Sequence, residues 1–417
     1  MPDTARDAGE GDAVDGGTSG RAGFTSRPLR RPMHGRRPDE AHRASTPLEL
    51  LFDLCFVVAV SFAAGQLHEA LSAGEAGRGV IGFVTVFFAI WWAWMNFSWF
   101  ASAYDTDDVP YRVAVLVQII GVLVLATGIP TAFAGTSFVL VTAGYVIMRT
   151  SAVTQWLRAA RGDPPRRRTA LRHAVGFSVL AVGWLVRLAV PVPWSTALLV
   201  VLVAGELLVP VWAARVGAIP WHPGHMAERY SLFTLIVLGE CVLATTTALG
   251  AALTGDGASI EQLVLAGAGL LIVFALWWLY FDQPAEGLLT SFRAAIGWGY
   301  GHLLVFASLA ALGAGLQYEI DEAHDDGQQF AGLAVGIPVA LFVLVVWLVH
   351  IRPRRPDRLR AAFPVAALVI LALTATLATT PTTATLGTAV TLIALLVAVV
   401  LVSRPSRAGR RSAVSDS

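Results

Sequence analysis

Apolar stretches of about 20 residues recur along most of the chain, and short polar segments separate them. A helix of roughly 20 residues is long enough to cross about 30 Å of hydrocarbon. The regular alternation of apolar and polar residues that a membrane β-barrel needs is absent, so the expected elements are helices. The pattern predicts an all-α, polytopic bundle with about twelve transmembrane helices, at 47–71, 80–100, 110–129, 136–157, 170–190, 194–212, 227–252, 262–281, 296–317, 330–350, 361–380 and 383–403.

The two ends of the chain differ from this apolar region in composition. Residues 1–46 are rich in Gly, Asp, Ser, Pro and Arg and contain no apolar run. Such a segment buries too little surface to offset its conformational entropy, which predicts disorder. The predicted organisation is a disordered tail at 1–46, a first six-helix half at 47–212, a linker at 213–226, a second six-helix half at 227–403 and a disordered tail at 404–417.

Composition supports a membrane protein and excludes some chemistry. Of the 417 residues, 55% are hydrophobic and only 14% are charged, whereas soluble domains carry about 25% charged residues. All 30 basic residues are Arg, which excludes any mechanism that needs a Lys Schiff base or amine nucleophile. Cys55 and Cys241 lie in separate apolar runs, a placement typical of packing rather than of a disulfide or a metal site.

The arginines predict the orientation of the chain. They cluster at 21–43, 158–172, 352–360 and 404–411. With twelve spans all four clusters fall on one side of the membrane, and the acidic stretch at 319–326 falls on the other. Cytoplasmic loops carry the excess of Arg. We therefore expect a multi-pass membrane protein with both termini in the cytoplasm.

A spacing shared by two parts of the chain predicts an internal duplication. Cys55 precedes Trp91, the first residue of a Trp pair, by 36 positions, and Cys241 precedes the paired Trp277 by 36 positions as well. Both halves would begin on the same side, which corresponds to a parallel 6+6 repeat about an axis along the membrane normal. The alternative is coincidence, because Trp is common at membrane interfaces.

Carboxylates inside apolar runs are the main candidates for chemistry, because a charge at the bilayer centre is costly. Glu49 and Asp53 are four residues apart, which places them on one helix face, where two carboxylates can share a proton. Glu240 lies 12 residues after Glu228, about 18 Å further along a helix.

Glu240 is either a proton- or cation-binding carboxylate or a buried group held by a partner, for which Arg149 is a candidate. Glu206 is a further carboxylate of the same kind, and structural ion pairs also persist in helix bundles.

Three polar features nearer the helix ends have simpler explanations. Asp282 follows an aromatic run and has Arg293 as a possible partner. His302 can accept a proton, although a single His in a helix is usually packed or capped. The stretch from His222 to His225 has too loose a spacing for a zinc site, so no metal is expected. Walker, HExxH and GxSxG motifs are absent, and the sequence predicts neither a catalytic residue nor a cofactor.

Three motifs occur in order along the chain. They are Leu-Glu-Leu-Leu-Phe-Asp-Leu-Cys-Phe-Val at 48–57, Glu-Arg-Tyr-Ser-Leu-Phe-Thr-Leu-Ile-Val-Leu-Gly-Glu at 228–240, and Trp-Trp-Leu-Tyr-Phe-Asp at 277–282 followed by His302. In this order they resemble the motifs of the bacterial low temperature requirement A (LtrA) family, over about residues 46–403. The resemblance implies a polytopic protein of the bacterial inner membrane but no substrate, because the family name records a growth phenotype. Its polar signature positions are Glu49, Asp53, Glu228, Arg229, Glu240, Asp282 and His302.

Three functions remain open from the sequence. The first is a secondary, proton-coupled transporter of an unknown small solute or ion, supported by the twelve spans, the repeat and the embedded carboxylates. The second is a membrane enzyme that acts on a lipid or isoprenoid through Glu49 and Asp53. The third is a non-catalytic scaffold or sensor. The expected partners are the lipid bilayer and the solute, and no nucleic acid; the sequence does not specify an oligomeric state.

Overall fold

The computed structural model describes residues 29–37, 40, 43–254, 258–323, 331–353, 357–378 and 380–403. These residues form twelve long helices and no strand, so the all-α prediction is confirmed. The helices are α1 (Pro47–Ser72), α2 (Ala76–Tyr104), α3 (Val109–Phe133), α4 (Val139–Gly162), α5 (Arg167–Arg187), α6 (Trp194–Ala214), α7 (Pro223–Thr254), α8 (Ile260–Phe281), α9 (Phe292–Asp321), α10 (Ala331–Val346), α11 (Asp357–Thr376) and α12 (Pro381–Ser403). Short turns η1 (Pro164–Arg166) and η2 (Glu286–Leu288) and a π-helical turn, η3 (Trp347–Ile351), connect some of them.

Eleven of the twelve helices are long and apolar enough to cross a membrane, and α4 is the exception among the described residues. Helix α4 carries Arg149, Arg158 and Arg161 within its 24 residues, which lowers its hydropathy. It nevertheless packs between α3 and α5. The twelve predicted helices are therefore present, but α4 depends on its neighbours for a place in the bundle.

Side-chain caps determine where several helices begin. The Thr46 hydroxyl accepts a hydrogen bond from the Glu49 N–H (3.3 Å), and the Glu49 carboxylate accepts one from the Thr46 N–H (2.7 Å). Together with Pro47 in the first turn, this reciprocal pair forms a capping box at the start of α1. Asp108 caps α3, and Ser259 caps α8. Each cap satisfies backbone N–H groups that have no partner within the helix.

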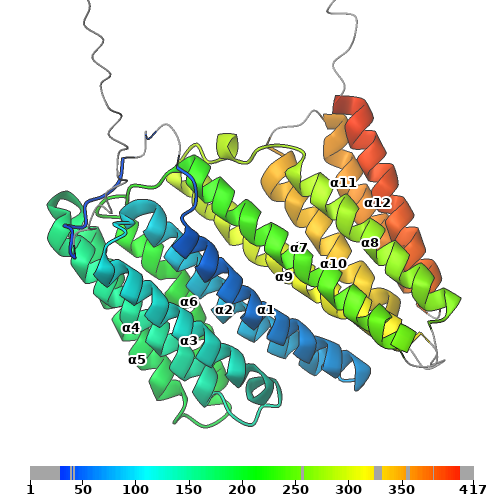
Figure 1. Ribbon diagram of the computed structural model, residues 1–417, viewed down its shortest axis with the longest axis horizontal. Helices are drawn as coiled ribbons and strands as arrows, with labels where there is room; N and C mark the ends of the chain where they lie inside the picture. Colours follow the sequence, from blue (N-terminus) through cyan, green and yellow to red (C-terminus); the bar gives the residue numbers. More distant parts are fainter. Residues whose placement is uncertain are drawn as a thin grey trace, which may run out of the picture.

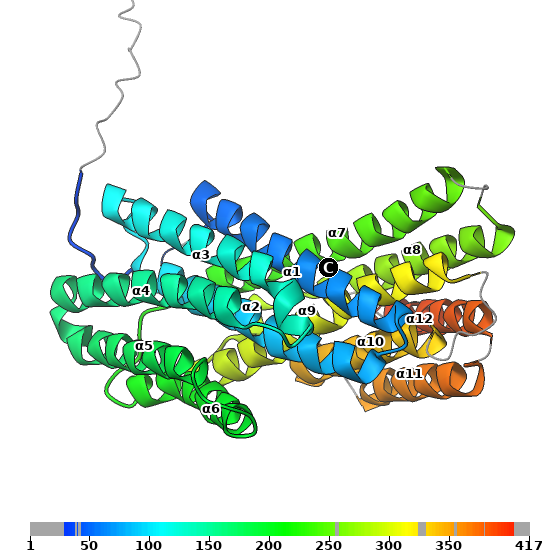
Figure 2. The same ribbon diagram turned by 90° about the horizontal axis from the view of Figure 1, so that it is seen from below.

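Helices α1, α2, α7 and α9 form the middle of the bundle (Figures 1 and 2). Helix α1 contacts α2, α3, α7 and α9, and α2 contacts α7 and α9 as well. Figure 2 shows α3–α6 on one side of these helices and α8 and α10–α12 on the other. The start of α1 and the end of α12 lie on the same side of the molecule (Figure 1), as an even number of antiparallel spans requires.

Neighbour order is similar in the two sets of six helices. In each set the first helix packs on the second and third, the third on the fourth, the fourth on the fifth and the fifth on the sixth. The Trp pairs that suggested a duplication differ, because Trp91 and Trp92 are buried whereas Trp277 and Trp278 are 44% and 47% exposed. The 6+6 repeat is therefore not confirmed and stays a prediction.

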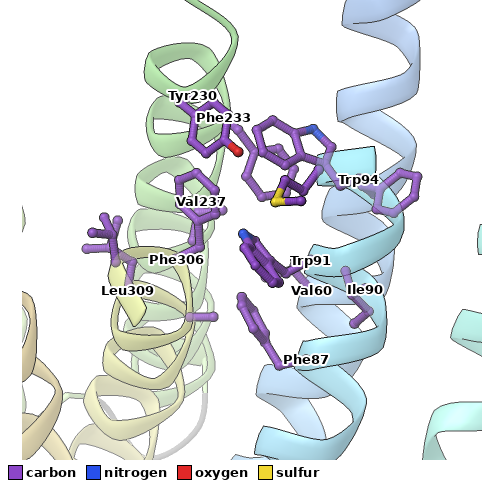
Figure 3. Close-up of a cluster of buried hydrophobic side chains, with 14 of the residues drawn as sticks. Val60, Phe87, Ile90, Trp91, Trp94, Tyr230, Phe233, Val237, Phe306 and Leu309 are labelled. Atoms are coloured by element: carbon purple, nitrogen blue, oxygen red, sulfur yellow. The ribbon is translucent and has the colours of Figure 1, made fainter. Parts of the chain in front are cut away.

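A dry aromatic core joins the two sets of helices (Figure 3). Trp94 of α2 packs against Phe233 of α7, with ring centroids 4.5 Å apart, and edge-on against Tyr230 of α7 at 4.8 Å. Phe306 of α9 lies edge-on to the same indole at 5.5 Å. Such aromatic pairs add about 0.5–1.5 kcal/mol each beyond the area that they bury. Helices far apart in sequence are thus held together around Trp94.

Helices α3 and α4 approach so closely that their backbones touch at two glycines. A Cβ atom at Gly144 would lie 2.4 Å from the carbonyl oxygen of Gly121. Small residues allow this approach, which is a common way for membrane helices to associate.

The described residues before α1 lie against the ends of the helices. The Arg31 N–H donates to the Asp108 carboxylate (2.9 Å), and the Arg36 N–H donates to the carbonyl of Ala103 (2.9 Å). Met33 is buried against Gly162. These contacts differ from the disorder that composition predicts up to residue 46, because a few anchoring residues are hidden among many polar ones.

Candidate functional site

Five buried ionisable side chains from three segments meet at one end of the bundle, near the start of α1. We call them the ionic cluster; all are at most 5% exposed. The cluster comprises Arg43 from the segment before α1, Glu49 and Asp53 of α1, and His225 and Arg229 of α7.

The pair of Asp53 and Arg229 is the centre of the ionic cluster. Arg229 Nη2 donates to Asp53 Oδ1 at 2.6 Å and lies 3.2 Å from the Ser98 hydroxyl of α2. The indole N–H of Trp94 donates to the same carboxylate oxygen at 2.6 Å. This set of contacts ties α1, α2 and α7 together, directly beside the aromatic core around Trp94.

Glu49 contacts basic groups from two directions. Its Oε1 atom is 3.1 Å from His225 Nε2, 3.5 Å from Arg229 Nη1 and 4.0 Å from Arg43 Nη2. Its other oxygen accepts the Thr46 N–H in the capping box. The residue that begins α1 therefore also links α1 to α7.

Arg43 covers the end of α2. Its guanidinium donates to the carbonyls of Ser102 and Ala101 and lies 3.8 Å from the Asp105 carboxylate. The last carbonyls of a helix have no partner within it and carry partial negative charge, so a cation is stabilised there. This geometry explains how an arginine from the polar N-terminal segment is buried.

Counting Asp105, three carboxylates face two guanidinium groups. Glu49, Asp53 and Asp105 are negative when ionised, while Arg43 and Arg229 are positive. Burial and the nearby charge of Glu49 raise the pKa of Asp105 to about 6, although Arg43 acts in the opposite direction. With His225 uncharged, the three carboxylates and two guanidinium groups are neutral overall when one proton is added, and Asp105 takes up a proton near pH 6.

Few other ionisable groups face the ionic cluster. Tyr111 of α3 is buried beside it, and Arg36 forms an ion pair with Glu40 at 2.6 Å. Since the Arg36–Glu40 pair is neutral overall, it does not compensate the extra carboxylate.

Several buried atoms of the ionic cluster have no hydrogen-bond partner among the described residues. They include Arg43 Nε, Asp53 Oδ2, Arg229 Nε and His225 Nδ1. Glu49 Oε1, Arg229 Nη1 and His225 Nε2 also make no hydrogen bond, but they contact one another at 3.1–3.5 Å as ion pairs. Most buried polar atoms in proteins do have a hydrogen-bond partner. Together with Asp105, the ionic cluster thus has excess negative charge beside atoms that make no hydrogen bond with a described residue.

Glu206 of α6 lies in a second buried site, in which four donors surround one carboxylate. They are Arg149 Nη2 (2.9 Å), the Tyr145 hydroxyl (2.8 Å) and the indole N–H groups of Trp92 (2.8 Å) and Trp184 (3.2 Å). The donors come from α4, α2 and α5, so this carboxylate connects four helices. Both of its oxygens are satisfied, which is typical of a structural ion pair.

The idea that Arg149 could neutralise Glu240 is therefore wrong, because Arg149 pairs with Glu206. Glu240 is partly exposed on α7 and makes no hydrogen bond or ion pair with any described residue. It follows Arg229 by 11 residues, about 16 Å along the helix. The structure thus keeps Glu240 apart from Asp53.

His302 is buried in an aromatic environment. Its Nδ1 is 2.8 Å from the carbonyl of Trp298, which only accepts, so Nδ1 donates and Nε2 is left to accept from the Tyr280 hydroxyl at 2.9 Å. The Trp298 indole in turn donates to His350 Nε2 at 3.3 Å. Both nitrogens of neutral His302 are used, which describes a packed and hydrogen-bonded histidine.

The remaining predicted residues lie at helix ends. Glu228 accepts the Ser45 N–H at 3.2 Å and so fastens the segment before α1 to α7. Asp282 directly follows α8, and its carboxylate accepts from the side chain of Gln283. Of the predicted positions, Glu49, Asp53 and Arg229 come together, whereas Glu206, Glu240, Asp282 and His302 lie elsewhere.

Sequence reasoning missed Arg43, Trp94 and His225 as members of the candidate site. Helix α7 begins at Pro223, four residues before the predicted start, which places His225 in the first turn. Proline is favoured at the first helical position, so Pro223 was the available signal. Among the described residues, no three His, Cys, Asp or Glu side chains are grouped so that they could hold a metal ion.

Apolar helices with buried carboxylate–arginine pairs define an integral membrane protein that crosses the bilayer many times. The family model described as "Bacterial low temperature requirement A protein (LtrA)" matches residues 44–402, and the chain belongs to this family. It is therefore a polytopic protein of a bacterial membrane. It is also similar to the "Uncharacterized protein RA0937" of Rhizobium meliloti (strain 1021), with 28% identity over 332 residues that cover 75% of this chain and 78% of that protein. No solved structure matches the chain.

Proposed function

We propose that this protein is a secondary transporter of the inner membrane that couples proton binding to movement of a small solute. The observation that supports this proposal is the ionic cluster together with Asp105, where three carboxylates face two guanidinium groups at the meeting point of α1, α2 and α7. Ionisable residues inside membrane bundles commonly mark proton and ion pathways.

The position of the Asp53–Arg229 pair suggests how coupling would work. The pair joins the first helix of one predicted half to the first helix of the other. Protonation of Asp53 would remove one of the two carboxylates that face Arg229 and weaken this contact. Proton binding would then change the relative stability of two arrangements of the halves, which is the requirement for a coupled switch.

The proposed orientation places the ionic cluster on the cytoplasmic side. The described Arg-rich segments, 30–37 with Arg43 and 158–172, flank helix ends at the same end of the bundle as the cluster. The positive-inside tendency assigns that end to the cytoplasm. Both termini would then be cytoplasmic.

Proton flux in proteoliposomes tests the transport proposal. Vesicles that enclose a pH-sensitive dye are energised with a potassium gradient and valinomycin, and a panel of small solutes is added outside. Wild-type protein should show solute-dependent proton uptake, and Asp53→Asn should lose it. Glu75→Gln, in an exposed ion pair with Arg78, is the control and should keep it. Unchanged uptake in a folded Asp53→Asn protein would refute the proposal.

A non-catalytic scaffold is the second candidate, and the Glu206 site favours it. A carboxylate with four donors is a closed contact that holds helices in place. If this function is correct, variants of both buried sites should lose stability and no flux should be measurable.

A lipid-modifying enzyme is less supported by the geometry. The acidic loop between α2 and α3 does not present its carboxylates together, because Asp107 pairs with Arg112 and Asp108 pairs with Arg158, each at 2.7 Å.

A further inference from the structure

An apolar cavity of about 450 Å³ lies between α2, α4, α5, α6 and α9, away from the ionic cluster. Its volume is in the range of about 300–1,000 Å³ that small-molecule sites occupy. The wall is formed mainly by aliphatic and aromatic side chains, including Phe87, Phe88, Trp184, Val203 and Leu303. Such a lining suits a hydrocarbon chain.

The cavity opens to the surface of the bundle that faces lipid. Three of its lining residues, Val84, Val200 and Leu304, are 59%, 65% and 43% exposed. In a membrane these side chains contact acyl chains, so a ligand can enter sideways from the bilayer.

The depth of the cavity corresponds to one leaflet. It extends from Arg187, the last residue of α5, to Leu207 of α6. Arg187 contacts Ser195 of α6, and Leu207 lies 12 residues further along α6, a distance of about 18 Å. One leaflet contributes about 15 Å of hydrocarbon. A single extended chain fits this length.

Arg187 provides a charge at the shallow end of the cavity. Its guanidinium lies over the ring of Phe138 at 4.9 Å, and its Nε atom donates to the carbonyl of Ser195 at 3.1 Å. It forms no ion pair with any described residue, and no carboxylate influences it. A cation without an acidic partner at the end of an apolar cavity is complementary to an anionic head group.

The inner end of the cavity is connected to the Glu206 site. Tyr145 and Trp184 line the cavity and donate to the Glu206 carboxylate at the same time. The buried ion pair therefore holds two wall residues in place, which makes the cavity a preformed feature of the fold.

From these observations we infer that the cavity binds an anionic amphiphile, whose single hydrocarbon chain fills the apolar space and whose acidic head group pairs with Arg187. This site is distinct from the ionic cluster and does not depend on the proposed transport function. A free fatty acid has this chemistry, and so does an anionic phospholipid that inserts one of its two acyl chains.

Photolabelling of the full-length protein in phosphatidylcholine nanodiscs tests the inference. The first probe is a palmitate with a diazirine in its chain, and mass spectrometry locates its adducts. Adducts should concentrate at 84–89 and 199–207, and excess unlabelled palmitate should remove them. Adducts spread evenly over lipid-facing residues, or insensitive to palmitate, would overturn a free fatty acid as the occupant.

Two substitutions on α6 distinguish labelling inside the cavity from labelling of the lipid-facing surface. Val203→Trp fills the cavity and should abolish labelling there. Val201→Trp is the matched control, because Val201 is 64% exposed on the same helix and does not line the cavity. Equal labelling of both variants would contradict the assignment. If Val203→Trp does not fold, the test rests on whether excess unlabelled palmitate removes the adducts in the wild-type protein.

The head group is tested with Arg187→Gln and a neutral alcohol analogue of the probe. Loss of a charge-assisted hydrogen bond should weaken palmitate binding about tenfold and leave alcohol binding unchanged. Equal binding of acid and alcohol by the wild type would overturn the role of Arg187. Labelling by a diazirine phosphatidylglycerol identifies a membrane lipid as the occupant, labelling by palmitate alone identifies a free acid, and labelling by neither refutes the site.

Discussion

Neutralising Glu206 should destabilise the protein strongly, because its carboxylate is the only acidic partner of Arg149 among the described residues. Glu206→Gln preserves the size of the side chain and leaves one carbonyl oxygen for the four donors. It also leaves the guanidinium of Arg149 buried without a counter-charge. Removing one member of a buried ion pair costs about 3–5 kcal/mol. Because the amide oxygen still accepts hydrogen bonds, the expected loss in free energy of unfolding is about 3 kcal/mol.

A double-mutant cycle distinguishes this explanation from general disruption. Arg149→Met removes the guanidinium charge that Glu206→Gln leaves buried without a counter-charge. The double variant should therefore be more stable than the sum of the two single changes predicts, by about 1–3 kcal/mol.

The assay is reversible unfolding in mixed micelles of dodecylmaltoside and increasing dodecyl sulfate, followed by tryptophan fluorescence. Trp92 and Trp184 touch the carboxylate, so emission should report on this site. Glu75→Gln, which breaks an ion pair that is about half exposed, is the control and should cost less than about 1 kcal/mol. A loss for Glu206→Gln no larger than that of the control, or strictly additive effects in the cycle, would refute the reasoning.

Three further predictions follow from other parts of the structure. The pKa of Asp105 is raised to about 6 in the folded protein, so its protonated form stabilises the fold at low pH, and this stabilisation is lost as the pH rises from about 4 to 6. Asp105→Asn should therefore raise the melting temperature at pH 8 more than at pH 4. Equal shifts at both pH values would contradict this prediction. Gly144→Ala places a Cβ atom 2.4 Å from a backbone oxygen of α3 and should lower the free energy of unfolding by about 2 kcal/mol or more in the same assay. Gly239→Ala, with open space around it, is the control and should leave the free energy of unfolding unchanged or slightly higher. Similar losses of stability at both glycines would be inconsistent with the α3–α4 contact. Glu240→Gln removes no contact that the structure describes and should change the unfolding free energy by less than about 0.5 kcal/mol, so a large loss would indicate a partner for Glu240.

Most of the fold could be predicted from the sequence, because a helix that crosses a bilayer must be apolar over about 20 residues. Twelve apolar runs predicted twelve helices at nearly the observed positions. Helix ends were less accurate where a cap, such as Pro223 before His225, lay outside the apolar run. Hydropathy detects the part of a helix that lipid contacts and not the turns beyond it.

The candidate site was only partly accessible. Glu49, Asp53 and Arg229 stood out individually, but the contact between Asp53 and Arg229 spans 176 residues of sequence, and no local pattern encodes it. Position along the helix was used to place Glu240, and Arg149 was suggested as its partner. Depth does not define which side of a helix faces which neighbour, and α4 faces Glu206 of α6.

Arg43 shows a second limit of sequence patterns. Composition describes its segment as polar and disordered, although this one guanidinium is 5% exposed and covers the end of α2. A single buried charge among many solvated ones leaves composition unchanged. Only the three-dimensional position of the α2 carbonyls identifies it.

The central claim is that the ionic cluster together with Asp105, with three carboxylates facing two guanidinium groups, takes up one proton near pH 6. Infrared difference spectra of the purified protein between pH 5 and pH 8 test this directly, because a protonated carboxyl has its own C=O stretch. The account predicts a carboxyl band that titrates near pH 6, is lost in Asp105→Asn and is retained in Glu240→Gln. The absence of this band in the wild type, or an unchanged band in Asp105→Asn, would contradict the account.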